Sequence, residues 1–133
     1  YLDLAGSGNE THAHLTVDGR ITIMVCNFEQ PALILRLYGT GKPVLPQDHG
    51  WEELAAHFKL LPGTRQIFDI AVDSVQTSCG WGVPFMEFER ERDTLVKYYA
   101  GRDPEEFVAR RRSRDRSIDG IPTRPTDRYF AGD

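Results

Sequence analysis

The strongest constraint on the fold is a pair of apolar runs joined by a very short connection. Residues Arg20–Phe28 and Leu33–Gly41 are rich in Ile, Leu and Val, and the connection between them contains Pro31. Such residues favour extended strands, and a short connection between two strands favours an antiparallel hairpin. Two further strands are predicted, an alternating one at Tyr1–Leu4 and another at Arg65–Val75.

The helical signals are short and lie between or after the strands. A helix is predicted at Trp51–Phe58, where apolar side chains recur with i, i+3, i+4, i+7 spacing. Another is predicted to begin at Asp103, a suitable N-cap residue that is followed by Pro104. Shorter helical segments are predicted at Asn9–Leu15 and Asp93–Ala100. This order favours a mainly β (α+β) fold, an antiparallel barrel with peripheral short helices, over a parallel βαβ sheet.

The length of the chain, 133 residues, favours a single domain. We expect that domain to cover residues 1–122. Residues 123–133 contain Pro125 and several polar side chains, so this tail is predicted to be extended or disordered. Because Tyr1–Leu4 reads like the middle of a strand, we also expect N-terminal strands of the barrel to be missing from the sequence.

Composition restricts the compartment of the protein. The longest apolar runs fall far short of the ~20 residues that a membrane-spanning helix needs. The two cysteines, Cys26 and Cys79, are too few for a disulfide scaffold and lack the spacing of a metal site. We therefore expect a soluble, cytoplasmic protein that does not associate with membranes.

An arginine cluster, Arg110–Arg116, raises the possibility of nucleic-acid binding. Acidic residues surround the cluster, the net charge of the chain is −4, and no aromatic residues interleave for base stacking. A solvated helix face with ion pairs is the better interpretation. No nucleic-acid partner is expected.

The segment Leu4–Thr11 is the first candidate binding site, because it passes from a strand through two glycines into a predicted helix start. Glycines allow close approach of a ligand, and free amides at a helix N-terminus favour an anion. The spacing matches neither a dinucleotide fingerprint nor a P-loop. An ordinary capped turn is the alternative interpretation. The candidate residues are Gly6, Ser7, Gly8, Asn9 and Thr11.

The second candidate is the segment Ser78–Pro84, in which two glycines flank an aromatic residue directly after a strand. Exposed amides and a flat side chain would suit a planar ring system, and the alternative is a tight loop with the tryptophan packed on the barrel. The candidate residues are Cys79, Gly80, Trp81 and Gly82.

No catalytic or metal-binding residue is identified from the sequence. Cys79 has no histidine near it in sequence to act as a base. None of the four histidines makes a known ligand spacing with Cys, Asp or Glu, so no metal is expected.

The ordered set of segments resembles the pyridoxamine 5′-phosphate oxidase-related family of FMN-binding split barrels. No single segment is diagnostic, but the set spans nearly the whole chain. The segments are Tyr1–Thr11, Arg20–Cys26, Ile34–Gly39, Ser78–Pro84, Glu91–Leu95 and Ser117–Pro122.

The resemblance implies a six-stranded antiparallel split β-barrel that forms a homodimer, with FMN held between the two subunits. It places the loop Gly6–Thr11 near the phosphate of the cofactor and the loop Ser78–Pro84 near its ring or the dimer interface. It also places further cofactor contacts on strands that precede Tyr1.

The function implied by the resemblance is an FMN-dependent oxidoreductase that acts on a small-molecule substrate or electron donor of unknown identity. Oxidation of pyridoxamine phosphate itself is not expected, because no basic cluster for the substrate phosphate is found. A non-catalytic flavin-, deazaflavin- or haem-binding protein is the alternative, and a dimer with a purely structural role remains open.

Overall fold

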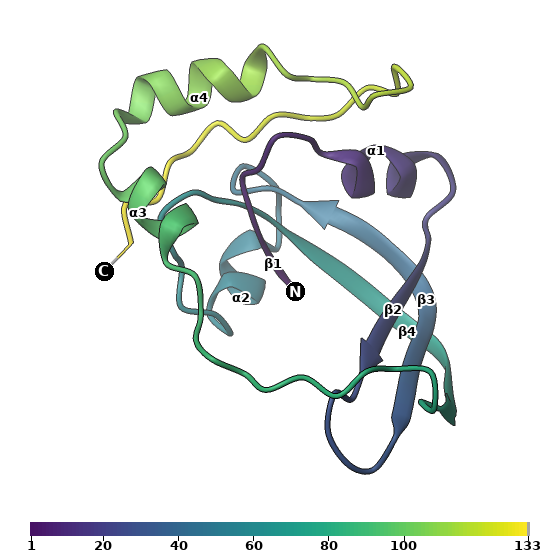
Figure 1. The fold of residues 1–133 in the computed structure, drawn as a ribbon. Helices are drawn as coiled ribbons and strands as arrows, with labels where there is room; N and C mark the ends of the chain where they lie inside the picture. Colours follow the sequence, from purple (N-terminus) through teal and green to yellow (C-terminus); the bar gives the residue numbers. More distant parts are fainter. Residues whose placement is uncertain (133) are drawn as a thin grey trace.

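The two apolar runs form the antiparallel hairpin that the sequence predicts. In this computed structural model, which describes residues 1–132, they lie in strands β2 (Arg20–Cys26) and β3 (Leu33–Val44). The other strands are β1 (Leu2–Leu4) and β4 (Thr64–Cys79). The four strands form one antiparallel sheet in the order β1-β4-β3-β2, curled into a half-barrel (Figure 1). The predicted mainly β fold with peripheral helices is confirmed.

Strands β3 and β4 are longer than predicted because they pair from Leu33 with Cys79 to Val44 with Ile67. A bulge between Tyr38 and Gly39 interrupts the register. A side chain at Gly39 would collide with the carbonyl oxygen of Ala71, so only glycine permits the two backbones to approach here. The predicted strand ended at Gly41, whereas β3 continues to Val44.

The helices are α1 (Glu10–Val17), α2 (Trp51–Ala55), α3 (Thr94–Ala100) and α4 (Pro104–Arg112). The predicted N-cap of α4 is confirmed, since Oδ1 of Asp103 accepts a hydrogen bond from N–H of Glu106 at 2.9 Å. Helix α2 is shorter than predicted, because the N–H groups of His57 and Phe58 bond to carbonyls three residues back. None of the described helices has the length and apolarity to cross a membrane.

Residues 123–132 have no regular secondary structure, yet they pack against both apolar clusters of the domain. One cluster surrounds Trp51 of α2, and Phe130 stacks on that ring at 5.7 Å between centroids. The other contains Phe107 of α4, whose ring meets Tyr129 edge-on at 5.2 Å. The tail therefore contributes to the core rather than extending away from it.

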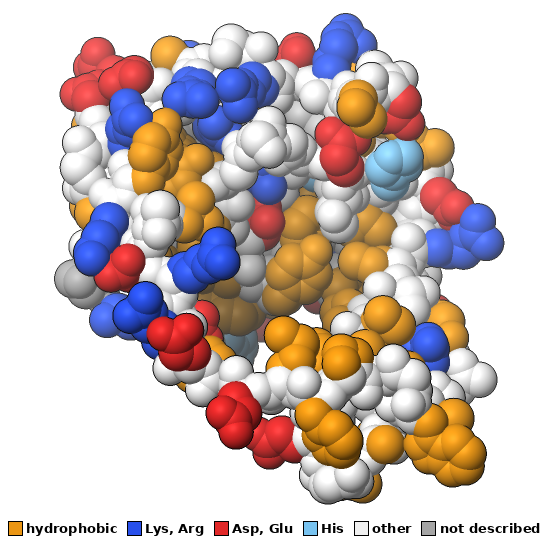
Figure 2. Space-filling view, in the orientation of Figure 1, with side chains coloured by type: hydrophobic (Ala, Val, Ile, Leu, Met, Phe, Trp, Pro, Cys, Tyr) orange, Lys and Arg blue, Asp and Glu red, His pale blue; other side chains and the backbone are white. Residues whose placement is uncertain are grey.

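The end of the sheet farthest from α1 leaves apolar side chains uncovered on one face. Because directly opposed residues share a face, Ile23, Leu37 and Val75 lie side by side there, next to Val25 and Leu35. Val75 is 60% exposed and Val25 is 53% exposed. Figure 2 shows hydrophobic side chains in the hollow of the molecule and at the tip of the sheet.

The side chain of Gln66 on β4 is fully buried and uses both N–H donors and its amide oxygen in hydrogen bonds. Its Nε2 donates to Oδ2 of Asp3 on β1 at 2.7 Å and to Oδ1 of Asn9 at 2.8 Å. Its Oε1 lies 2.6 Å from Nδ1 of His12 on α1. One amide thus joins β1, the loop after it and α1 to β4.

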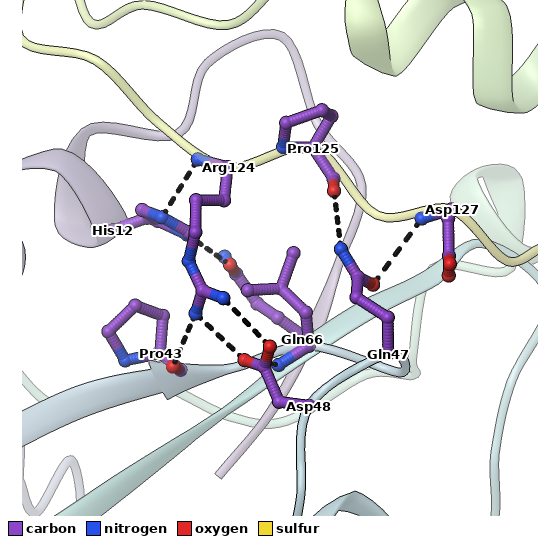
Figure 3. A network of polar contacts seen from close by, with 9 residues as sticks. His12, Pro43, Gln47, Asp48, Gln66, Arg124, Pro125 and Asp127 are labelled. Atoms are coloured by element: carbon purple, nitrogen blue, oxygen red, sulfur yellow. Dashed lines mark hydrogen bonds and ion pairs between the residues drawn. The ribbon is translucent and has the colours of Figure 1, made fainter.

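His12 continues this network to the tail (Figure 3). Its Nε2 accepts a hydrogen bond from the backbone N–H of Arg124 at 3.1 Å, so the ring is neutral and carries its proton on Nδ1. The guanidinium of Arg124 forms two bonds to the carboxylate of Asp48, at 2.7 and 2.8 Å. These contacts fix the tail against α1 and the segment before α2.

Replacing Gln66 by Met preserves its length but leaves Asn9 and Nδ1–H of His12 without partners. Because each buried unsatisfied group costs roughly 1–3 kcal/mol, we expect Gln66→Met to lower the free energy of unfolding by about 3 kcal/mol. Urea denaturation measures this. Gln76→Met, at an exposed position of the same strand, should change it by less than about 0.5 kcal/mol; equal losses in the two variants would contradict the role of the network.

Burial lowers the pKa of His12, and the charges of Arg124 and Arg65 lower it further, against the raising effect of the bond to Gln66. The unfolded chain therefore binds a proton on this ring more readily, with a pKa of about 6.5. Stability should be full above that pH and fall as the pH drops below it. Urea denaturation between pH 7.5 and pH 5.5 should show the decline, and His12→Gln should reduce its slope. His57→Gln, at an exposed position, should leave the slope as it is.

Candidate cofactor site

The loop Gly6–Asn9, between β1 and α1, is held by three arginines that donate to its carbonyl oxygens. Nη1 of Arg65 on β4 bonds to the carbonyl of Gly8 at 2.7 Å, and Nη1 of Arg111 on α4 bonds to that of Gly6 at 2.9 Å. Nη1 of Arg114, just after α4, reaches the carbonyl of Ser7 at 3.3 Å. Three successive carbonyls are thus directed to cationic groups.

The bonds to the carbonyls also set the direction of the N–H groups in the same peptide units. In a trans peptide the C=O and N–H point in opposite directions, so the N–H groups of Ser7, Gly8 and Asn9 face away from the arginines. No hydrogen bond from these three N–H groups to another described residue is found. Unpaired backbone N–H groups that point to the same side can bind an anion.

The start of α1 adds to this donor set. Asn9 stands at the N-cap but its side chain makes no capping bond, because Oδ1 is occupied by Gln66. Among the described residues no side chain caps the first turn of α1, and the side chains of Ser7 and Thr11 are exposed beside it. The carboxylate of Glu10 opposes an anion here, although N–H of Ile118 donates to both of its oxygens at 3.2 Å. The turn thus has no side-chain cap at Asn9, and its binding of a ligand stays a prediction.

In the arginine cluster behind the loop, Arg110, Arg112, Arg114 and Arg116 are exposed, as expected for a solvated helix face, but the expected ion pairs are not found among the described residues. Arg111 is only 6% exposed, and burial lowers its pKa, as do the charges of Arg65, Arg114 and Arg110. The burial of Arg111 could have been inferred from its sequence position, because it follows Phe107 by four residues and so lies on the same, buried face of α4.

The second candidate segment lies at the tip of β4. Cys79 ends the strand opposite Leu33, and N–H of Val83 closes a tight turn on the carbonyl of Gly80 at 2.9 Å. A side chain at Gly80 would press on the backbone of Leu33 at 2.7 Å, which explains the glycine. Trp81 is 87% exposed and so is not packed on the sheet. Gly82 follows in the same turn, with open space around it.

The two candidate segments lie at opposite ends of β4. The loop Gly6–Asn9 contacts Arg65 at the beginning of the strand, and Gly80–Gly82 follows its last residue. Sixteen residues at a rise of about 3.3 Å each separate them by roughly 50 Å along the strand. Within one chain the structure does not bring the predicted phosphate loop and the predicted ring loop together.

One cluster of ligand-type side chains was missed in the sequence. Glu10 and His14 are one turn apart on α1, and Asp119 joins them, so that one ligand atom of each lies within 4.8 Å of the others. Asp119 is distant from Glu10 and His14 in sequence, so local spacing does not link it to them. All three are half-buried or exposed, and the absence of a metal stays a prediction.

Comparison with known proteins identifies a relative of this chain. The pyridoxamine 5′-phosphate oxidase family protein ustO of Aspergillus flavus is 35% identical over 96 residues, which are 71% of this chain and 39% of the relative. The chain therefore spans about two fifths of that protein's length. No family model and no solved structure matches the chain.

The printed name of this relative agrees with the resemblance carried by the ordered sequence segments. The chain therefore belongs to the pyridoxamine 5′-phosphate oxidase-related family.

Proposed function

We propose that this protein binds FMN and acts as an FMN-dependent oxidoreductase on a small-molecule substrate. The observation that carries the proposal is the loop Gly6–Asn9, whose three amides are turned outward by arginines bonded to its carbonyls. Family membership supports a flavin as the ligand. The free thiols of Cys26 and Cys79 are consistent with the reducing cytoplasm in which we propose that it works.

The chain would contribute a phosphate grip to this site. The oxygens of a phosphate monoester would accept hydrogen bonds from two kinds of donor. The backbone donors are the N–H groups of Ser7, Gly8 and Asn9 and those of the first turn of α1. The side-chain donors are the hydroxyls of Ser7 and Thr11. Once bound, the flavin supplies the electron-transfer chemistry, and the protein supplies binding, orientation and exclusion of water. This division of labour is consistent with the lack of a recognisable acid–base pair in the sequence.

We also propose that the functional unit is a homodimer. The uncovered face of the sheet around Ile23, Leu37 and Val75 is apolar, and such surfaces mark interfaces. A two-fold arrangement repeats the same patch on both subunits. It would also bring the loop Gly6–Thr11 of one subunit toward Trp81 of the other, which a single chain keeps apart.

Purified full-length protein should be yellow or become so on addition of FMN, with the absorption bands of a bound flavin. A protein that is colourless and takes up no added FMN would contradict the proposal. Oxidation of a reduced nicotinamide donor by the flavin-loaded protein separates an oxidoreductase from a non-catalytic flavin protein. A spectrum of haem, or binding of deazaflavin alone, would favour the corresponding alternative cofactor.

Thr11→Ala removes a hydroxyl donor from the proposed phosphate grip. A hydrogen bond to a charged group is worth roughly 1.5–3 kcal/mol, so the affinity for FMN should fall about ten- to a hundredfold. Riboflavin, which lacks the phosphate, should bind weakly and be little affected. Quenching of flavin fluorescence measures both ligands.

The matched control is Thr16→Ala, which changes the same residue type near the other end of α1, where its hydroxyl bonds to the carbonyl of Ala13. It should leave the affinity for both flavins unchanged. If Thr11→Ala lowers FMN and riboflavin binding equally, or lowers neither, the loop does not bind the phosphate.

Val75→Asp places a charge on the uncovered face without disturbing a buried contact, since Val75 is 60% exposed. If this face joins two subunits, light scattering at micromolar concentration should report a dimer for the wild type and a monomer for the variant. Gln76→Asp, the next residue on the opposite face, should remain dimeric. A wild-type monomer would contradict the homodimer.

A further inference from the structure

A narrow pocket lies on the arginine side of the loop Gly6–Asn9, opposite its free amides. Five arginines line it: Arg65 from β4, Arg111 from α4, Arg114 and Arg116 from the segment after α4, and Arg124 from the tail. No aspartate or glutamate is among its lining residues. Lys and Arg side chains gather over α4 in Figure 2.

Only two of these five cations have a carboxylate partner. Arg65 pairs with Asp3 at 2.8 Å, and Arg124 pairs with Asp48 at 2.7 Å. Among the described residues, no ion pair is found for the other three arginines of the pocket. Three positive charges in one pocket therefore lack compensation.

Arg111 is partly satisfied, because its Nη1 donates to the carbonyl of Gly6. The residue is 94% buried by its 6% exposure, and its Nε is a buried donor without a hydrogen-bond partner among the described residues. An uncompensated buried cation is costly. Burial lowers the pKa of Arg111, and repulsion by the charges of its neighbours Arg65 and Arg114 lowers it further. A bound anion would offset all of these costs together.

We propose that this pocket is an oxyanion site that takes a phosphoryl group, as free phosphate or as part of a small phosphate ester. Guanidinium groups match the oxygens of phosphate in geometry and charge. Three uncompensated cations suit a dianion better than a single carboxylate. The site is distinct from the proposed flavin-phosphate grip, because the same peptide units present their carbonyls to this pocket and their N–H groups to the opposite side.

The site does not depend on flavin binding, so the two proposals can fail separately. The probe is inorganic phosphate, added to the full-length protein at constant ionic strength with chloride as the comparison salt. Phosphate should raise the melting temperature in a saturable way, and titration calorimetry should give its affinity. A thermal shift no larger than that from chloride would overturn the proposal.

Arg114→Gln removes a cation from the pocket at an exposed position and should weaken phosphate binding roughly tenfold. Arg112→Gln is the matched control, since Arg112 is an exposed arginine that does not line the pocket, and it should bind like the wild type. Arg111→Lys keeps the charge but removes the planar fork, and should also weaken binding. Equal affinity in Arg114→Gln and Arg112→Gln would contradict the assignment.

Saturation with FMN distinguishes the two sources of the phosphoryl group. If phosphate binds equally well to the FMN-saturated protein, the pocket is a separate site. If FMN displaces phosphate one for one, the pocket is where the cofactor's phosphate binds, and a separate site is ruled out. If the protein binds phosphate through Arg114 but does not bind FMN, the phosphate site is supported and the proposed flavin function is contradicted.

Discussion

The candidate site depends on the buried amide of Gln66. Its two N–H groups and its carbonyl oxygen bond to Asp3, Asn9 and His12, which belong to three successive segments of the chain. Because each bond uses a different lone pair or proton, the amide admits one orientation only. That orientation also occupies the side chain of Asn9 and so leaves the first turn of α1 uncapped. The buried bond between Gln66 and Asn9 is thereby linked to the missing side-chain cap of α1.

The hydrogen bonds from arginines to the carbonyls of the loop Gly6–Asn9 fix the orientation of its peptide units, so that the loop has two different sides. Peptide geometry makes the faces opposite in character, with carbonyls on the arginine side and N–H groups on the other. In the two proposals made above, each side binds an anion, one through N–H groups and the other through guanidinium groups. Arg65 on β4 and the neighbouring Arg111 and Arg114 at the end of α4 each bond to one of the three carbonyls.

Local signals predicted the hairpin of β2 and β3, the start of α4 at Asp103 and the position of the candidate loop. These features depend on residues close in sequence, for which propensity and capping rules are informative. The roles of Arg65, Gln66 and Arg111 depend on partners 54 to 105 residues away. No spacing rule encodes such pairs, so a cluster that looked solvated proved partly buried. Pairing across the bulge at Gly39 likewise extended two strands beyond their apparent ends.

The separation of the two candidate segments along β4 constrains how any cofactor could use both. A ligand with its phosphate at Gly6–Asn9 would have to follow almost the whole of β4, about 50 Å along the curved strand, to place a planar ring at Trp81 of the same chain. The segments can share one ligand only if a second subunit supplies one of them. The apolar face between them is uncovered along this same strand. An exposed apolar sheet and a divided binding site therefore favour the same solution, association of two copies along β4.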